Sequence, residues 1–304
     1  MVVLITGSSG FVGEVLLKKL KEQSFDTFGI DIKKGEFTDL IQDISKPFEI
    51  KEKVNVIIHL AAKLEHERCS KEEYFASNVV GTKNLLNIAK QNNAYFIYIS
   101  TTAVYGSPDS QITEKTQTAP NGDYAFTKLK GEEICQEYQK DGLDISIIRS
   151  GIILGEKRLG IYNFIFENLY NNSIIPILGN GKNKISFVNV NDIVEFLIHL
   201  VKNKKSGLIV NFGGLIPGNL NEIIQDLKDY TNSNAKLIHL PVQLIVFLKL
   251  LAKLKLIPVT PWHLSIMCKD NYYDNKVLLS TGYSYKYEPI DALKAMADYY
   301  KAHH

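Results

Sequence analysis

The chain has 304 residues, of which 45% are hydrophobic and 22% are charged. This composition excludes a disordered or collagen-like chain, and a formal net charge of +2 excludes a large basic field that holds nucleic acid or a membrane by charge alone. Cys69, Cys135 and Cys268 form no Cys-x-x-Cys pair, which predicts reduced thiols and no metal site. We expect a cytoplasmic protein without a membrane span, because neither a signal-peptide pattern nor an apolar run of roughly 20 residues is found.

Short β-branched runs alternate with helix-period segments through the first half of the chain. The expected strands span residues 2–6, 27–31, 54–60, 95–100 and 145–149, and the expected helices span 11–21, 74–90 and 124–140. This order is typical of an α/β fold with a doubly wound parallel sheet. We expect one domain over residues 1–150, whose sheet is completed by the strand, helix and strand pattern of 186–212. Residues 151–304 are otherwise broken by glycine and proline, which predicts a smaller cap interleaved with that domain.

Three glycines follow the first expected strand in Thr6-Gly7-Ser8-Ser9-Gly10-Phe11-Val12-Gly13. Gly7 allows a tight turn, Gly10 lets the backbone approach a pyrophosphate, and Gly13 lets the next helix pack close to the sheet. Free N–H groups and the positive end of the helix dipole then hold the diphosphate. The predicted dinucleotide-binding residues of this loop are Gly7, Ser9, Gly10, Phe11, Val12 and Gly13, which makes the first domain Rossmann-like.

Asp31 ends the second expected strand, 18 residues after Gly13, close to where an acid binds the adenosine ribose. A carboxylate at this place repels a 2′-phosphate, so we expect NAD rather than NADP. The Asp43-Ile44 pair is a candidate for contact with the adenine. For both acids the alternative is a solvated turn residue.

Tyr124 and Lys128 stand four residues apart in a helical segment, so they share one helix face. A fixed ammonium is expected to lower the pKa of a phenol from its usual value of about 10. The pair can then move a proton while a nicotinamide moves a hydride. Upstream, Ser100, Thr101 and Thr102 follow a strand at the sheet edge where ligands bind, and for Ser100 and Thr102 we expect only bonds to backbone groups.

Together these motifs resemble the extended short-chain dehydrogenase/reductase superfamily, in particular its NAD-dependent epimerase/dehydratase group. The matching segments are 6–13, 59–62, 78–86, 100–106, 124–132 and 187–192. The resemblance implies NAD as cofactor, with Tyr124 as the acid/base and Lys128 lowering its pKa and holding the nicotinamide ribose. It also implies that Thr101 hydrogen-bonds the reacting oxygen and that Asn78 supports the site. Further implied cofactor contacts are Leu60, Ala61 and Ala62, and the cap over 151–304 is implied to bind the substrate.

The chain also departs from that group at positions that bear on the substrate. Thr102 and Ala103 stand where dehydratases carry an Asp-Glu pair, so dehydration is not expected. Ile152 and Ile185 stand where many sugar-nucleotide epimerases carry an Asn and an Arg that contact the diphosphate. Lys182 or Lys184 can substitute electrostatically, although a lysine does not copy the fork of an arginine.

We expect an NAD-dependent enzyme that moves a hydride at a secondary alcohol or ketone of a small molecule, in the first place a nucleotide-activated sugar. One alternative is a dehydrogenase or reductase of a hydrophobic alcohol, similar to hydroxysteroid dehydrogenases and dihydroflavonol reductases, which Ile152, Ile185 and the apolar segment 237–256 favour. The other is an NAD-binding sensor without catalysis, against which Thr101, Tyr124 and Lys128 argue.

Three further expectations concern the surroundings of the site. Segment 237–256 is expected to be buried in a core rather than to contact a membrane. His66 and Glu67 are expected to form a loop salt bridge, with contact to the substrate as the alternative. A two-fold dimer through helices of the first domain is common in such folds.

Overall fold

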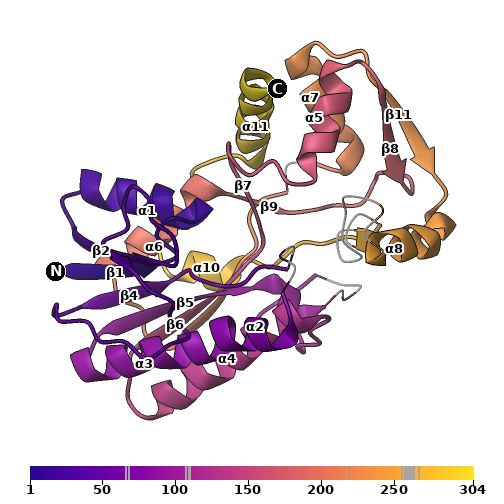
Figure 1. Ribbon diagram of the computed structural model, residues 1–304. Coiled ribbons are helices and arrows are strands. Elements are labelled where there is room, and N and C mark those ends of the chain that lie inside the picture. Colours follow the sequence, from indigo (N-terminus) through magenta and orange to yellow (C-terminus); the bar gives the residue numbers. More distant parts are fainter. Residues whose placement is uncertain are drawn as a thin grey trace.

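The computed structural model describes residues 1–304 except 66, 68, 107, 109–110, 217, 255, 257–263 and 266–267. Seven parallel strands form one sheet in the order β10-β6-β5-β4-β1-β2-β3 (Figure 1). Their bounds are β1 Val2–Thr6, β2 Asp26–Asp31, β3 Leu40–Ile41, β4 Val56–His59, β5 Tyr95–Thr101, β6 Ile145–Ser150 and β10 Leu208–Phe212. The predicted α/β fold with a doubly wound sheet is confirmed.

Helices cover both faces of this sheet (Figure 1). Helices α1 (Phe11–Glu22) and α6 (Val190–Lys202) pack on one face, and α3 (Gly81–Asn92) and α4 (Asp123–Lys140) pack on the other. Because side chains alternate along a strand, Val3 and Ile5 of β1 join the core under α1 while Leu4 joins the core under α3. The sheet with these helices, together with α10 (Lys276–Ser280), is called the sheet domain below.

The segment expected to be one helix over 74–90 is divided by a π-helical turn. Helix α2 (Lys71–Phe75) leads into the turn η1 (Ala76–Val80), and α3 follows. Such turns often lie at functional sites, because the extra residue re-aims a side chain. Here the turn carries Asn78, which is 1% exposed.

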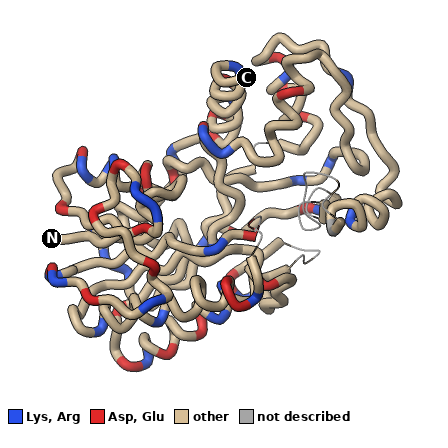
Figure 2. The backbone as a smooth tube through the Cα atoms, in the orientation of Figure 1, with Lys and Arg blue, Asp and Glu red and all other residues tan. Residues whose placement is uncertain are grey.

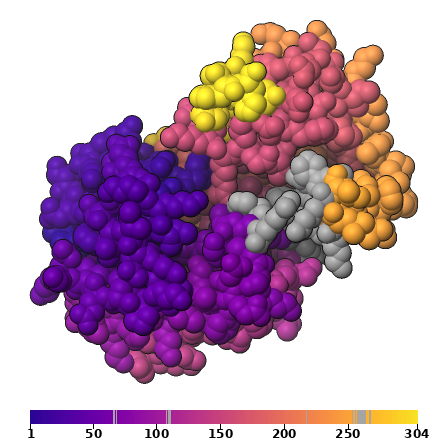
Figure 3. Space-filling model, viewed as in Figure 1, coloured from indigo at the N-terminus to yellow at the C-terminus, as the bar shows by residue number. Residues whose placement is uncertain are grey.

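The described elements after β6, other than α6, β10 and α10, form the cap, which meets the sheet domain along a seam (Figure 3). They are β7 Ile152–Leu154, α5 Tyr162–Tyr170, β8 Ile174–Leu178, β9 Phe187–Asn189, α7 Leu220–Thr231, β11 Lys236–Leu240, η3 Val242–Leu244, α8 Ile245–Lys253 and α11 Pro289–His303. The cap has its own apolar core, in which Phe166, Ile223 and Met296 join α5, α7 and α11. Strand β9 pairs with β7 outside the large sheet, so only β10 of the 186–212 pattern joins that sheet.

Segment 237–256 is not buried, so that prediction is wrong. Strand β11 pairs with β8, and α8 packs only one side, including Ile245, Leu248 and Ala252, against the cap. Its other apolar positions face outward, and Val246 is 75% exposed. Apolar residues nearly all round this helix therefore do not mark a core position, because only one of its sides packs against other described residues. Among the described helices, none is long and apolar enough to cross a membrane.

Candidate active site

The glycine loop after β1 leaves no space for side chains. A Cβ atom on Gly13 would lie 2.0 Å from the carbonyl oxygen of Gly7, and Gly7 itself has a φ of +76°. Helix α1 begins directly after Gly10, which gives it no side-chain cap. The first N–H groups of α1 are thus oriented to bind an anion, which fits the diphosphate of a dinucleotide. For Phe11 and Val12 the binding role stays a prediction.

Asp31 lies beside this loop at the carboxyl end of β2. Its Oδ2 accepts a 2.9 Å hydrogen bond from the Ser9 N–H, and its Oδ1 accepts one of 3.1 Å from the Lys33 N–H. The Ser9 N–H is therefore engaged by Asp31, which differs from a loop whose N–H groups are all free for a phosphate. A carboxylate oxygen keeps further lone pairs, so this position fits the predicted contact with a ribose.

Asp43 and Ile44 follow β3 and have different surroundings. Asp43 is exposed and accepts hydrogen bonds from the N–H and hydroxyl of Ser45, and the hydroxyl bond holds the Asp43 pKa below its usual value. Ile44 is 5% exposed and packs against Gly81, where a Cβ would lie 2.8 Å from its Cδ1. The side chains thus belong to a turn and to the core, and a contact of either residue with adenine stays a prediction.

The chain after β4 lies against the end of β1, and contact of Leu60, Ala61 and Ala62 with the cofactor stays a prediction. The Leu60 N–H donates to the Thr6 carbonyl at 3.2 Å, and the Ala61 N–H donates to the Thr6 hydroxyl at 3.3 Å. His59, which is 1% exposed, holds the same hydroxyl through Nδ1 at 2.7 Å. Burial lowers the His59 pKa well below its usual value, so the ring is a neutral link at physiological pH.

Asn78 connects three parts of the site. Its Oδ1 accepts the Lys63 N–H at 2.8 Å, and its Nδ2 donates to the Lys63 carbonyl at 3.1 Å. The same Nδ2 donates to the Thr127 hydroxyl at 3.1 Å, within the turn of α4 that joins Tyr124 to Lys128. Asn78 therefore fixes the loop after β4 relative to α4.

Thr101 ends β5 and Tyr124 stands in the first turn of α4, and their side chains are hydrogen-bonded to each other. Burial raises the Tyr124 pKa to about 12, although the bond to Thr101 and the charge of Arg158 act to lower it. The phenol is therefore protonated at neutral pH and can donate its proton. Of the three predicted catalytic residues, Thr101 and Tyr124 carry hydroxyl groups, and the fold brings these two groups together.

Lys128 lies one turn along α4 and is 2% exposed, with Nζ 4.1 Å from the ring centre of Tyr98. Burial lowers its pKa to about 7, so the amine holds only about half a proton at neutral pH. This differs from the expectation that a full ammonium at Lys128 lowers the Tyr124 pKa. The physical reason is that the low-dielectric surroundings of the amine disfavour its own charge.

The motifs do not indicate Arg158 and Glu65, whose charges act on Tyr124, or Tyr162, which interacts with Arg158. Arg158 and Tyr162 come from the cap, and the charge of Arg158 acts on both Tyr124 and Tyr162. The Arg158 guanidinium carbon lies 5.6 Å from the ring centre of Phe11, and burial lowers its pKa. Glu65 follows β4, and burial raises its pKa to about 7. One feature of the sequence sets Arg158 apart, which is the rarity of arginine. The chain has only three arginines.

A second arginine, Arg149, makes buried contacts that support the site. It makes a bidentate ion pair with Glu132, with contacts of 2.6 and 3.1 Å, and donates to the Tyr105 hydroxyl at 2.7 Å. Ser100 donates to Glu132 at 2.5 Å, and Thr102 bonds the Tyr273 hydroxyl. The expectation that Ser100 and Thr102 satisfy backbone groups is therefore wrong, since charged and phenolic side chains are their partners.

Ile152 and Ile185, the two positions whose residue types favour an apolar substrate, lie in the cap core. Ile185 is 4% exposed among the residues of that core, and Ile152 packs against the same cluster. They fill the cap, so they do not support a site for a hydrophobic alcohol. Lys182 and Lys184 are both exposed, and their role at a diphosphate stays a prediction.

The expected loop salt bridge involves a different partner. Glu67 forms an ion pair of 3.4 Å with Lys63, whereas His66 lies outside the described residues.

These residues fit NAD, since the loop has no room for a Cβ at Gly13 and Asp31 stands at its edge. When bound, NAD supplies the acceptor and donor of a hydride. The predicted role of Tyr124 is to accept the proton of a substrate hydroxyl as a phenolate, a form that the Thr101 bond and the Arg158 charge favour, and to return it as a phenol. The predicted role of Thr101 is to orient that hydroxyl. Asn78 holds the helix turn that carries Tyr124 through the Thr127 hydroxyl, and a contact of Lys128 with the nicotinamide ribose stays a prediction.

This chain is similar in sequence and in fold to known proteins. A family model described as "NAD dependent epimerase/dehydratase family" matches residues 3–213. An uncharacterized protein y4nG of Sinorhizobium fredii is 28% identical over 98% of this chain and 78% of its own. The UDP-N-acetyl-alpha-D-glucosaminuronate decarboxylase of Bacillus cytotoxicus is 29% identical over 79% of this chain and 83% of its own.

Among solved structures, the UDP-glucuronic acid 4-epimerase of Bacillus cereus in complex with NAD has a TM-score of 0.80 at 23% identity, over 99% of each chain. That similarity shows a shared fold. The family match extends over more than half of the chain and includes every residue of the predicted catalytic set. The chain belongs to the NAD-dependent epimerase/dehydratase family, as its motifs predict, and it is an NAD-dependent enzyme.

Proposed function

We propose that this enzyme inverts one hydroxyl of a nucleotide-activated sugar that carries a carboxylate. The hydroxyl is oxidised to a ketone and then reduced from the opposite face, so that the cofactor is unchanged after each cycle. The single observation that carries this proposal is the hydrogen-bonded pair Thr101 and Tyr124 beside the glycine loop, with the Arg158 charge acting on Tyr124. The sheet domain binds NAD, and the cap binds the sugar nucleotide.

Arg158 supports the acidic character of the substrate. Arg158 is half-buried, its pKa is lowered by desolvation, and among the described residues no carboxylate forms an ion pair with it. An arginine that is partly removed from water without an acidic partner is costly and is satisfied when a ligand brings an anion. Two of the similar proteins act on or bind uronic acid nucleotides by their names, which agrees with this reading.

The test is to incubate the protein with NAD and UDP-glucuronic acid and to separate the products by anion exchange. The expected product is an epimer of unchanged charge. A product without the carboxylate would contradict epimerisation, and no product with any UDP, dTDP or GDP sugar would contradict the substrate class. Thermal stabilisation by each nucleotide in the presence of NAD reports binding independently of turnover.

We further propose a two-fold dimer through α3 and α4. The outer sides of these helices form a groove that includes Lys83, Asn87, Ile134 and Tyr138, and Phe126 of α4 is 47% exposed. Light scattering should give twice the mass of the chain. A monomer at micromolar concentration would contradict this dimer.

We also place the enzyme in the cytoplasm. Cys69, Cys135 and Cys268 are all free thiols, which agrees with a reducing compartment. Fractionation of cells that produce the protein should recover it on the cytoplasmic side.

A further inference from the structure

Helix α8 shows apolar side chains to solvent. Val246 is 75% exposed, Phe247 56%, Leu250 53% and Leu254 60%. These positions lie on one side of the helix, because they are spaced by one, three and four residues. We call these four residues the outer face of α8. A surface helix normally turns polar residues outward, so this face is inverted relative to the usual pattern.

The apolar surface continues beyond the helix. Val242 and Leu244 of the preceding turn are 43% and 39% exposed, and Leu256 after the helix is 67% exposed. The inner positions Ile245 and Leu248 already pack against the cap, so the cap does not need the outer face for its own core. Contiguous exposed apolar residues of this kind mark an interaction site.

The segment that carries this surface has charges of one sign. From residue 230 to residue 269 the sequence contains five lysines and no acidic residue. The only charged residues in the sequence of α8 are lysines, and the helix carries blue segments in Figure 2. Lys249 follows Val246 by three residues, so it lies beside the outer face. The whole chain has a formal net charge of only +2, so this positive charge is a local feature.

Apolar residues flanked by lysines match the surface of an anionic bilayer. Such a helix lies in the interface plane, with its apolar side among the acyl chains and its lysines at the head groups. A protein partner is disfavoured by the same charges, because lysine is depleted in protein interfaces. We propose that the outer face of α8, with Val242 and Leu244, binds the surface of an anionic lipid bilayer.

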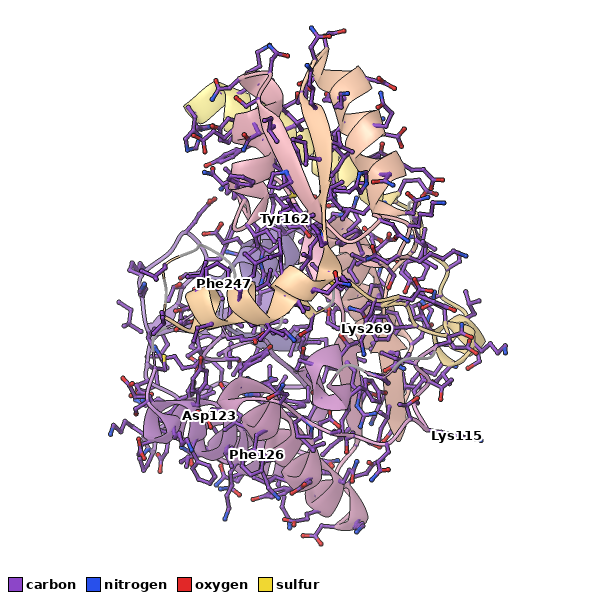
Figure 4. All side chains as sticks on the ribbon, turned by 90° about the vertical axis from the view of Figure 1, so that its right-hand side faces the viewer. Lys115, Asp123, Phe126, Tyr162, Phe247 and Lys269 are labelled. Carbon is purple, nitrogen blue, oxygen red and sulfur yellow. The ribbon has the colours of Figure 1, made fainter. Side chains whose placement is uncertain are left out.

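This placement has a consequence for the enzyme. In Figure 4, α8 with Phe247 crosses the face of the molecule between the cap and the sheet domain, and Asp123 at the start of α4 lies below it. Tyr124 is the next residue, so the docked face and the start of the catalytic helix lie on one side of the molecule. The inference stands on α8 alone and does not depend on the substrate proposed above.

The test uses co-sedimentation of the full chain with lipid vesicles. Wild-type protein should sediment with vesicles of equimolar phosphatidylglycerol and phosphatidylcholine and stay in solution with phosphatidylcholine alone. The double variant Phe247→Ser/Leu250→Ser should lower the partition coefficient roughly tenfold or more. Phe164→Ser, which changes a phenylalanine of α5 that is 44% exposed, is the matched control and should leave it unchanged.

Charge is tested separately, with less risk to folding. Lys249→Glu should lower binding to the anionic vesicles about fivefold or more, since each basic residue near the surface contributes about that factor. Lys115→Glu, an exposed lysine of the sheet domain, should have no effect. The proposal is wrong if wild-type protein does not sediment with anionic vesicles, or if Lys249→Glu binds these vesicles as tightly as wild-type protein. It is also wrong if the α8 variants convert a dimer to a monomer while vesicle binding is absent, because a second copy then covers the face.

Discussion

The two regions that enclose Tyr124 are held in place in different ways. On the side of the sheet domain, His59 and Asn78 are each 1% exposed and hydrogen-bond to two or more neighbouring segments. On the side of the cap, the loop of Gly155 and Arg158 rests on the Phe11 ring. The cofactor side is thus fixed by many polar links and the substrate side by few contacts. Substitutions on the first side should abolish function, and those on the second should change specificity.

The largest effect on ligand binding is expected at the glycine loop. Gly13→Ala should weaken NAD binding about a hundredfold or more, because the new Cβ would lie 2.0 Å from the Gly7 carbonyl oxygen and the loop must move. Calorimetric titration with NAD measures this change. Lys18→Ala, at an exposed position of the same helix, is the control and should bind NAD normally. Normal NAD binding by Gly13→Ala would show that the tight loop is not the dinucleotide cradle.

On the cap side, Arg158→Met should act on the substrate and not on NAD. We expect the KM for an acidic sugar nucleotide to rise about tenfold to a hundredfold, since a charged hydrogen bond to a ligand contributes on the order of 1.5–3 kcal/mol. Steady-state kinetics with calorimetry for NAD separates the two ligands. Lys157→Met is the control, because Lys157 is 67% exposed beside it. An unchanged KM would remove Arg158 from the substrate site.

A smaller effect is expected at Asp31, which is predicted to contact the adenosine ribose of the cofactor. Asp31→Ala should reduce the preference for NAD over NADP about tenfold, because the carboxylate no longer repels a 2′-phosphate. The ratio of the two dissociation constants measures it. If the unmodified protein binds NADP more tightly than NAD, the role assigned to Asp31 is contradicted.

The smallest effect concerns the stability contributed by the protonation of Lys128. The Lys128 pKa of about 7 is below the value of 10.5 for a free lysine, so between these values the unfolded chain binds more protons than the folded one. Raising the pH through this window therefore stabilises the folded chain, by about 1 kcal/mol from pH 7 to pH 8. Urea unfolding should show this increment in wild-type protein and in Lys130→Met, and lose it in Lys128→Met. An equal increment in Lys128→Met would show that Lys128 is not the group that titrates.

The same contrast explains what could be predicted from the sequence. Strand β1 and the start of α1 agree with the predicted residues, because the glycine spacing and the apolar runs are local signals. The sequence of the cap contains no such local signals. The apolar residues of α8 cannot show by periodicity which side has a partner, and Arg158 reaches Tyr124 through a loop without a motif. The raised Tyr124 pKa was also missed, because burial of Tyr124 and Lys128 is a property of the folded chain.

The central claim is that Tyr124 moves the proton while the bound cofactor exchanges a hydride with the sugar. The most direct measurement is a single turnover of the NAD-loaded protein with its sugar nucleotide, followed by the absorbance of reduced cofactor. Tyr124→Phe should slow hydride transfer about a thousandfold while the affinity for NAD stays the same. If Tyr124→Phe transfers hydride as fast as wild-type protein, another group moves the proton and the account is contradicted.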